Sequence, residues 1–96
     1  MTEDDLLKQV LKLAEKYNVT AFHTYDSRKS TGHGFPDLVM VGHQNVLFVE
    51  LKSQGANRST RQTDWFYRLT GAGAHYSLWR PTDYVSGHIE SVLRDL

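Results

Sequence analysis

Two apolar runs separated by four residues constrain the fold of this chain most strongly. The runs span 38–41 and 46–51, and each has the length and residue types of a β-strand. A symmetric hairpin with a two- or four-residue loop pairs residues whose numbers add up to 87. Strand side chains alternate between the two faces, and in this register both faces are apolar. A sheet of that kind needs helices packed on each side.

The rest of the chain supplies such helices and two further strands. Thr2 and Asp5 fit a capping box that opens an amphipathic helix, and Ser59 and Gln62 fit a second one. The expected elements are a helix from 2 to about 16, strands at 19–25, 37–41 and 46–52, a helix from 59 to 71, a strand at 74–79 and a C-terminal helix. We therefore predict one α/β domain spanning residues 1–96, with a mixed central sheet in the order αβββαβα.

Composition narrows the class of protein. A chain of 96 residues buries only a modest core, for which dimerisation is a natural supplement. The absence of cysteine excludes disulfides and thiolate metal sites. The start is acidic and no apolar run reaches the length of a membrane span, so we expect a soluble cytoplasmic protein. The net charge is zero, yet seven basic and only three acidic residues lie from Arg28 to Arg80.

One acid interrupts the second apolar run, where an unpaired carboxylate is costly. The register places Asp37 opposite this residue, Glu50, and Lys52 projects from the same face. Two opposed carboxylates repel each other unless a cation binds between them. Such a pair can hold Mg²⁺, with the backbone carbonyl of Leu51 as a third ligand, while Lys52 orients or deprotonates a nucleophile. The alternative is that Glu50 and Lys52 are solvated on an edge strand and Asp37 caps a turn.

The motifs together resemble a known family. Gly34-x-Pro36-Asp37, the apolar hairpin, Glu50-x-Lys52 and a following helix with Gln62 and Trp65 look like the VRR-NUC branch of the PD-(D/E)xK nucleases. The resemblance implies a restriction-endonuclease-like αβββαβ core, here with an added C-terminal helix. It also implies divalent-metal ligation by Asp37 and Glu50 and catalytic roles for Lys52 and Gln62. The acidic residue that the family carries on its first helix maps onto Glu3, with Asp4 and Asp5 as alternatives.

The resemblance also implies a substrate. Free-standing members of this branch resemble phage-encoded homodimeric nucleases that cut branched DNA such as four-way junctions. We therefore expect a Mg²⁺- or Mn²⁺-dependent endonuclease acting in phage or prophage replication and repair, within a bacterial or phage-infected cell. Two alternatives stay open: a nonspecific or end-dependent nuclease of the same fold, and a non-catalytic DNA-binding or assembly module.

Basic residues near the hairpin loops are candidates for DNA-backbone contacts. The set comprises Arg28, Lys29, His33, Arg58, Arg61 and Arg80. Each also has a simpler interpretation as a surface residue. In the same way Gln62 can serve only the helix cap, Glu3 can serve only the helix dipole, and Trp65 and Phe66 are interpreted as core. Because no recognition helix is evident, we expect recognition of DNA shape rather than of base sequence.

Overall fold

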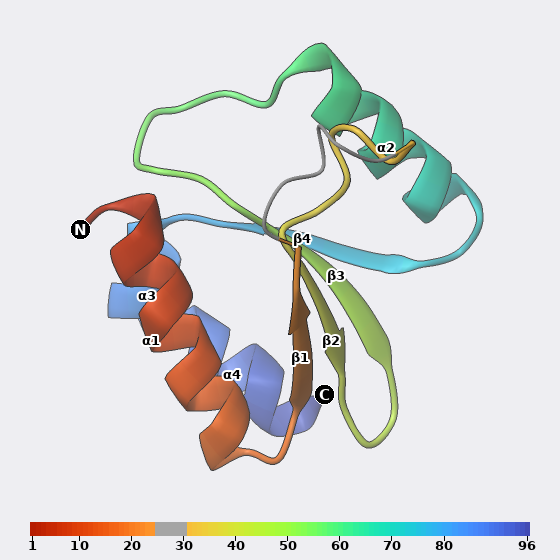
Figure 1. The fold of residues 1–96 in the computed structure, drawn as a ribbon. Coiled ribbons are helices and arrows are strands. Elements are labelled where there is room, and N and C mark those ends of the chain that lie inside the picture. Colours follow the sequence, from red (N-terminus) through yellow and green to blue (C-terminus); the bar gives the residue numbers. More distant parts are fainter. Residues whose placement is uncertain (25–30) are drawn as a thin grey trace.

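A mixed four-stranded sheet forms the centre of the molecule (Figure 1). The computed structural model describes residues 1–24 and 31–96. The strands β1 (Thr20–His23), β2 (Leu38–Val41), β3 (Val46–Leu51) and β4 (His75–Trp79) follow the spatial order β1-β2-β3-β4. The first three are antiparallel neighbours, and β4 runs parallel to β3. The predicted mixed sheet is therefore confirmed.

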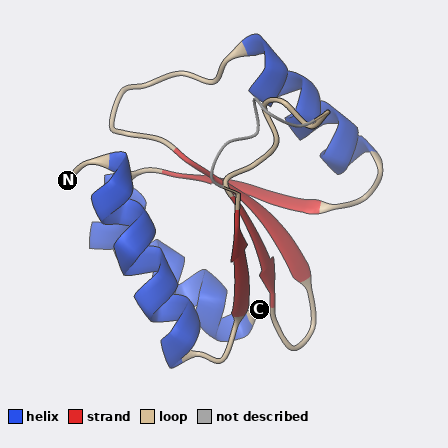
Figure 2. Cartoon of the chain, in the orientation of Figure 1, coloured by secondary structure: helices blue, strands red, loops and turns tan. Residues whose placement is uncertain are grey.

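Within the described residues, four helices cover this sheet on both sides. They are α1 (Glu3–Lys16), α2 (Thr60–Gly71), α3 (Pro81–Val85) and α4 (His88–Asp95). Figure 2 shows α1, α3 and α4 gathered on one side and α2 on the other. No helix in the two described ranges is long and apolar enough to cross a membrane.

The hairpin adopts the predicted register. Leu38 pairs with Val49 and Val41 pairs with Val46, so the paired numbers add up to 87 as expected. This register is fixed by burial, because a slip of one residue exchanges the two faces of a strand. Such a slip would turn Glu50 toward the apolar core that Val49 now occupies.

The core lies on the side of α1, α3 and α4. Leu38, Met40 and Val49 have no exposed surface, and they pack with buried residues of α1 and α4. The helical contribution comes from Leu6, Val10, Ala14, Ile89 and Leu93. Burial of a large aliphatic side chain contributes about 1.5–3 kcal/mol, so this face supplies most of the hydrophobic stabilisation.

The opposite face is covered less completely. None of the residues of α2, all of which the structure describes, is fully buried. Trp65 and Phe66 are partly buried, so our interpretation of them as core holds only in part. Away from α2, Phe22 is 64% exposed, Val41 45% and Val46 44%. One side of the sheet is thus a sealed core and the other is a partly open, mixed surface.

Local signals explain the helix ends. Both predicted capping boxes are present, Thr2 with Asp5 and Ser59 with Gln62. The C-terminal part differs from the prediction, because it forms two helices rather than one. Pro81 ends the strand as expected but also occupies the first turn of α3, where its missing N–H costs nothing. A left-handed residue, Gly87, then separates α3 from α4.

Candidate active site

The loop that carries Asp37 is held against α2. Gly34 has a φ of +88°, and a Cβ there would lie 2.7 Å from the backbone carbonyl carbon of Arg61. The carbonyl oxygen of His33 accepts a hydrogen bond from Trp65 Nε1 at 3.1 Å. The Phe35 ring packs edge-on against Trp65 with the ring centres 5.1 Å apart. These contacts explain why glycine precedes the Pro-Asp pair, since only glycine allows so close an approach to the helix.

Asp37 lies immediately before the first residue of β2. Its Oδ2 atom accepts a hydrogen bond from the backbone N–H of Leu51 at 2.7 Å. Burial raises the pKa of the Asp37 carboxyl and the Glu50 carboxylate raises it further, whereas the Leu51 N–H and Lys52 lower it. The predicted proximity of Asp37 and Glu50 is therefore confirmed, and their mutual repulsion appears in the pKa.

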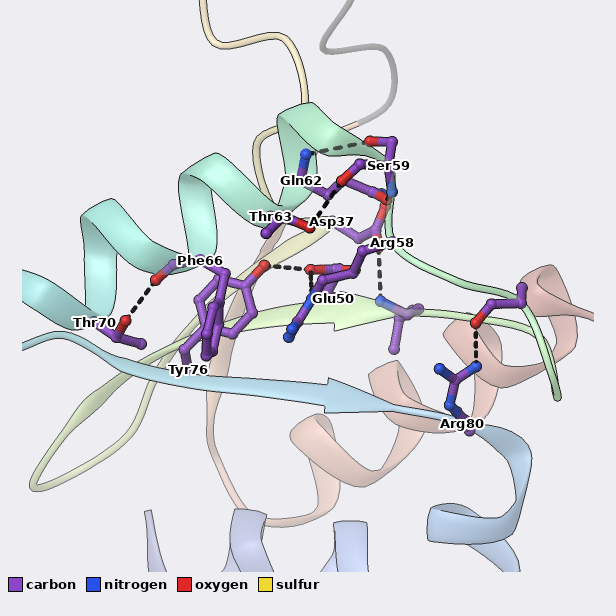
Figure 3. Close-up of polar contacts among 12 residues, drawn as sticks. Asp37, Glu50, Arg58, Ser59, Gln62, Thr63, Phe66, Thr70, Tyr76 and Arg80 are labelled. Atoms are coloured by element: carbon purple, nitrogen blue, oxygen red, sulfur yellow. Dashed lines mark hydrogen bonds and ion pairs between the residues drawn. The ribbon is translucent and has the colours of Figure 1, made fainter.

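Glu50 is the most deeply buried charged side chain of the described residues, with no exposed surface. One of its oxygens, Oε1, accepts hydrogen bonds from the Tyr76 hydroxyl and from Arg58 Nε, the latter at 3.1 Å (Figure 3). The other oxygen, Oε2, is buried and has no hydrogen-bond partner among the described residues. Burial and the Glu50 carboxylate raise the pKa of Tyr76 far above its ordinary value, so this phenol stays a donor.

The first-helix acid that faces this group is Glu3. Burial raises its pKa first, the charge of Asp37 raises it further, and Lys52 lowers it. Asp5 is committed to the capping box, since its Oδ2 accepts from the backbone N–H of Thr2 at 2.9 Å. Of the three acids left open by the sequence, the structure thus brings Glu3 into the field of the hairpin charges.

The carboxylate oxygens of Asp37 and Glu50 suit a hard divalent cation as metal ligands. An orphaned buried carboxylate oxygen such as Glu50 Oε2 is costly unless something compensates it. Magnesium is commonly bound through one or two carboxylates, with water and substrate oxygens completing its shell. Across residues 1–24 and 31–96, no three His, Asp or Glu side chains are gathered as a ready-made metal cage. Asp37 and Glu50 therefore fit a site that is completed by water and substrate.

Residues 2–81 match the VRR-NUC domain family. The chain belongs to the VRR-NUC family. Its fold is similar to that of a solved VRR_NUC domain protein, at 19% identity and a TM-score of 0.71, over 94% of this chain and 86% of the other. A second solved VRR_NUC domain gives 21% identity and a TM-score of 0.68, over 94% and 97% of the two chains.

A further structural relative is Hjc, a Holliday junction resolvase from Archaeoglobus fulgidus. It shares 25% identity with this chain at a TM-score of 0.50, over 82% of this chain and 65% of the resolvase. No curated protein matches the sequence. The chain is therefore a VRR-NUC nuclease domain with a resolvase-like fold, as its motifs indicated.

Two of the six basic residues expected to contact DNA, Arg58 and Arg80, have other partners in this VRR-NUC domain. Arg58 is turned inward to Glu50, and its guanidinium lies 4.2 Å from the centre of the Phe66 ring. Arg80 donates from Nη1 to the carbonyls of Ser53 and Ala56, at 3.0 and 2.6 Å, and so holds the loop after β3. Arg28 and Lys29 lie outside the described residues.

The remaining two candidates, His33 and Arg61, line a polar pocket beside α2. The pocket has a volume of about 270 Å³, and its lining is completed by Thr31, Asp64, Trp65 and Arg68. Arg61 and Arg68 form no ion pair with any described residue. Arg68 was not among the residues singled out from the sequence, although it lies seven positions after Arg61, on the same side of the helix.

Gln62 is engaged in the helix cap. Its Oε1 atom accepts a hydrogen bond from the backbone N–H of Ser59 at 2.9 Å, and its own N–H donates to Ser59 Oγ at 3.2 Å. The capping role that the sequence suggested for Gln62 is thus present. Its catalytic role stays a prediction.

Tyr76 is a residue of the candidate site that sequence reasoning missed. It pairs with Phe48 across the parallel β3–β4 ladder, which places it on the same face of the sheet as Glu50. A tyrosine in a strand is ordinarily unremarkable, because aromatic residues favour strands. Only the β3–β4 register reveals that its hydroxyl reaches the carboxylate.

Proposed function

We propose that this VRR-NUC domain is a Mg²⁺- or Mn²⁺-dependent endonuclease that hydrolyses phosphodiester bonds in branched DNA. The observation that carries the proposal is the convergence of Asp37 with Glu50, whose Oε2 atom is buried and has no hydrogen-bond partner among the described residues. The ligands are Asp37, Glu50 and the carbonyl of Leu51, with Glu3 as a further candidate. The family and the resolvase-like fold support a DNA substrate.

The charges of the site favour metal-dependent binding of phosphate. Three acids, Glu3, Asp37 and Glu50, face two cations, Lys52 and Arg58. The formal charge of this group is therefore negative by one, which repels DNA. A divalent cation reverses the sign, so that a phosphodiester is attracted to the site only when the metal is present.

The protein's own side chains then orient the reaction. A metal held by Asp37 and Glu50 would polarise the phosphate and lower the pKa of a bound water. Lys52 lies close enough to affect the pKa values of Asp37 and Glu3, and in this position it stabilises the negative charge that develops on the phosphate and orients the attacking water. Water forms a new bond to phosphorus and releases a proton to solvent, while the bond to one ester oxygen breaks and that leaving oxygen takes up a proton. Gln62, in the first turn of α2, is the candidate for a further contact to the water or phosphate.

A basic pocket extends the proposed DNA surface beyond the metal site. It is the 270 Å³ pocket lined by His33, Arg61 and Arg68. At most about 14 Å of chain separates His33 from Asp37, a reach of about four nucleotides along one strand. The pocket can therefore hold the backbone of the same strand that is cut.

The proposed assembly is a homodimer of this single domain. The sheet face that α2 packs on exposes Phe22, Val41 and Val46 where α2 does not cover it. Apolar side chains that gather on a strand face are typical of contact surfaces. A second copy would cover them and would provide the two active sites that paired cuts across a junction require.

A cleavage assay resolved by nucleotide position tests the function. Labelled four-way junctions, linear duplexes and single strands are incubated with the protein in Mg²⁺, in Mn²⁺ and in EDTA. Paired cuts near the branch point, with linear duplex left largely intact, are the expected result. Equal rates on junctions and linear duplexes would support a nonspecific or end-dependent nuclease instead. Binding of junctions without cleavage in either metal would support the non-catalytic module.

A further inference from the structure

The two oxygens of the Glu50 carboxylate have very different surroundings. Oε1 receives two hydrogen bonds, from the Tyr76 hydroxyl and from Arg58 Nε. Oε2 receives none from the described residues, although it is equally buried. A buried carboxylate has about four acceptor positions, so donors on both oxygens would be the cheaper arrangement. The asymmetry indicates that one oxygen is held and the other is kept available.

Tyr76 is placed by the sheet itself. It lies on β4 opposite Phe48, two residues before Glu50 on β3, and strand side chains two apart share a face. Its ring packs edge-on against Phe66 of α2, with the ring centres 5.1 Å apart. The hydroxyl is therefore fixed by a strand on one side and a helix on the other.

Arg58 is fixed by aromatic rings. Its guanidinium carbon lies 4.2 Å from the centre of the Phe66 ring and 5.5 Å from that of Tyr76. Arginine stacks well in this way because its charge is delocalised over a planar group. Its Nε donor reaches Glu50 Oε1 at 3.1 Å. The arginine thus gives the buried carboxylate a permanent counter-ion from one defined direction.

We propose that Tyr76 and Arg58 are positioning residues that hold Oε1 of Glu50 and thereby direct Oε2 toward the metal. The inference rests on the proposed function, because it requires that Glu50 binds the cation. Partners of a metal-ligating carboxylate fix its orientation, and their loss commonly weakens metal binding about ten- to hundred-fold. Tyr76 and Arg58 form one unit with Glu50, and neither of these two partners belongs to the sequence motif Glu-x-Lys.

A competing interpretation is that Arg58 takes the place of the cation and must leave before the metal binds. The contacts argue against it, because Arg58 reaches Oε1 and leaves Oε2 without a partner. The packing between two rings argues against it as well, since release would expose Phe66 and Tyr76. The two interpretations predict opposite effects of weakening the arginine contact on metal affinity.

The main test is Tyr76→Phe, which keeps the ring and removes the hydroxyl. Mn²⁺ is titrated into the metal-free protein and the free ion is followed by its EPR signal, with thermal unfolding in EDTA measured alongside. We expect Mn²⁺ binding at least about tenfold weaker than in wild type. Tyr67→Phe is the matched control, because Tyr67 is a neighbouring tyrosine that is 67% exposed. Equal Mn²⁺ affinity of Tyr76→Phe and wild type would overturn the proposal.

Arg58→Lys provides the second arm and conserves the charge. Lysine lacks the planar group and its Nε donor, so we expect weaker Mn²⁺ binding here too. Tighter binding would instead establish that Arg58 competes with the metal, and the positioning role would be abandoned. Wild-type protein that binds no Mn²⁺ would contradict the proposed function itself, which separates that failure from failure of the positioning role.

Discussion

The two faces of the central sheet differ in the side chains that they carry, because one face is aliphatic and buried and the other holds charged residues. On the side of α1, α3 and α4, the strands present aliphatic residues without exposed surface, such as Leu38, Met40 and Val49. On the side of α2, the same strands present Asp37 and Glu50, and no residue of that helix is fully buried. Successive side chains of the hairpin point to opposite faces. Residues that stabilise the core and residues of the candidate site therefore occupy adjacent positions in the sequence.

The difference shows where the molecule accepts a cost. Glu50 is buried beside Asp37, and the pKa of Asp37 is raised by its own burial and further by the Glu50 carboxylate. Natural proteins break local folding rules mainly at functional sites and offset the cost elsewhere. Here the sealed face provides that offset, which allows the other face to hold like charges together. Substitutions on the two faces should therefore separate activity from stability.

The largest expected effect is on activity alone. Lys52→Ala removes the cation that stabilises the phosphate and orients water, and we expect the cleavage rate to fall by about 10²–10⁴-fold. Because Lys52 is not part of the sealed core, the unfolding midpoint in urea should change little. Lys12→Ala, an exposed lysine of α1, is the matched control. Near-normal turnover by Lys52→Ala would remove this residue from the mechanism.

The next effect is on stability and compares neighbours in one strand. Leu38→Ala leaves a cavity in the sealed core and should lower the free energy of unfolding by about 2–5 kcal/mol. Val39 is only partly buried and faces α2, so Val39→Ala should cost about 1 kcal/mol or less. Urea unfolding of both variants measures the difference. Equal losses would mean that the α2 side is packed as tightly as the core.

Much of this arrangement was predictable from sequence because its causes are local. The hairpin register follows from two apolar runs and a short loop, and it correctly brought Asp37 to Glu50. Both capping boxes have signatures within four residues. Family motifs then gave the class of chemistry, because Pro-Asp and Glu-x-Lys lie on adjoining strands.

What escaped prediction depends on distant parts of the chain. Tyr76 reaches Glu50 only through a parallel pairing, and a parallel register leaves no turn signal in the sequence. Arg58 follows a loop whose path is set by Arg80, so its inward direction was not readable from its neighbours. Arg58 and Arg80 were both expected at the DNA surface, and their partners are not their neighbours in the sequence. The sequence could therefore not predict where these two side chains lie.

A smaller effect concerns the loop that carries Asp37 and packs against α2. Gly34→Ala forces a left-handed residue and sets its Cβ 2.7 Å from the backbone of Arg61, so the loop must move. We expect a loss of stability above the roughly 1–2 kcal/mol of a left-handed alanine, and slower cleavage because Asp37 follows the loop. Gly55→Ala has a similar φ of +84° and open space around it. It should lose only stability, as urea unfolding and cleavage rates will show.

The smallest expected effect is a pH dependence of Asp37. Burial raises the pKa of this carboxyl above its ordinary value, and the Glu50 carboxylate raises it further. In the pH range between the ordinary and the raised pKa, the folded protein holds a proton that the unfolded chain has lost. Unfolding then releases that proton, so the stability of the metal-free protein falls as the pH rises through this range.

Asp37→Asn isolates this contribution, because the amide oxygen can still accept the Leu51 N–H bond. In EDTA at neutral pH the variant should unfold at a higher urea concentration than wild type. The corresponding gain in the free energy of unfolding should be about 1 kcal/mol or less. The gap should close at acid pH, where the wild-type carboxyl is protonated in both states. Mg²⁺ should reverse the order, because a ligand that binds the folded state stabilises only the protein that retains the carboxylate. A variant less stable than wild type in EDTA would mean that Lys52 and the Leu51 N–H outweigh burial, and that the chemical face costs the fold less than its charges suggest.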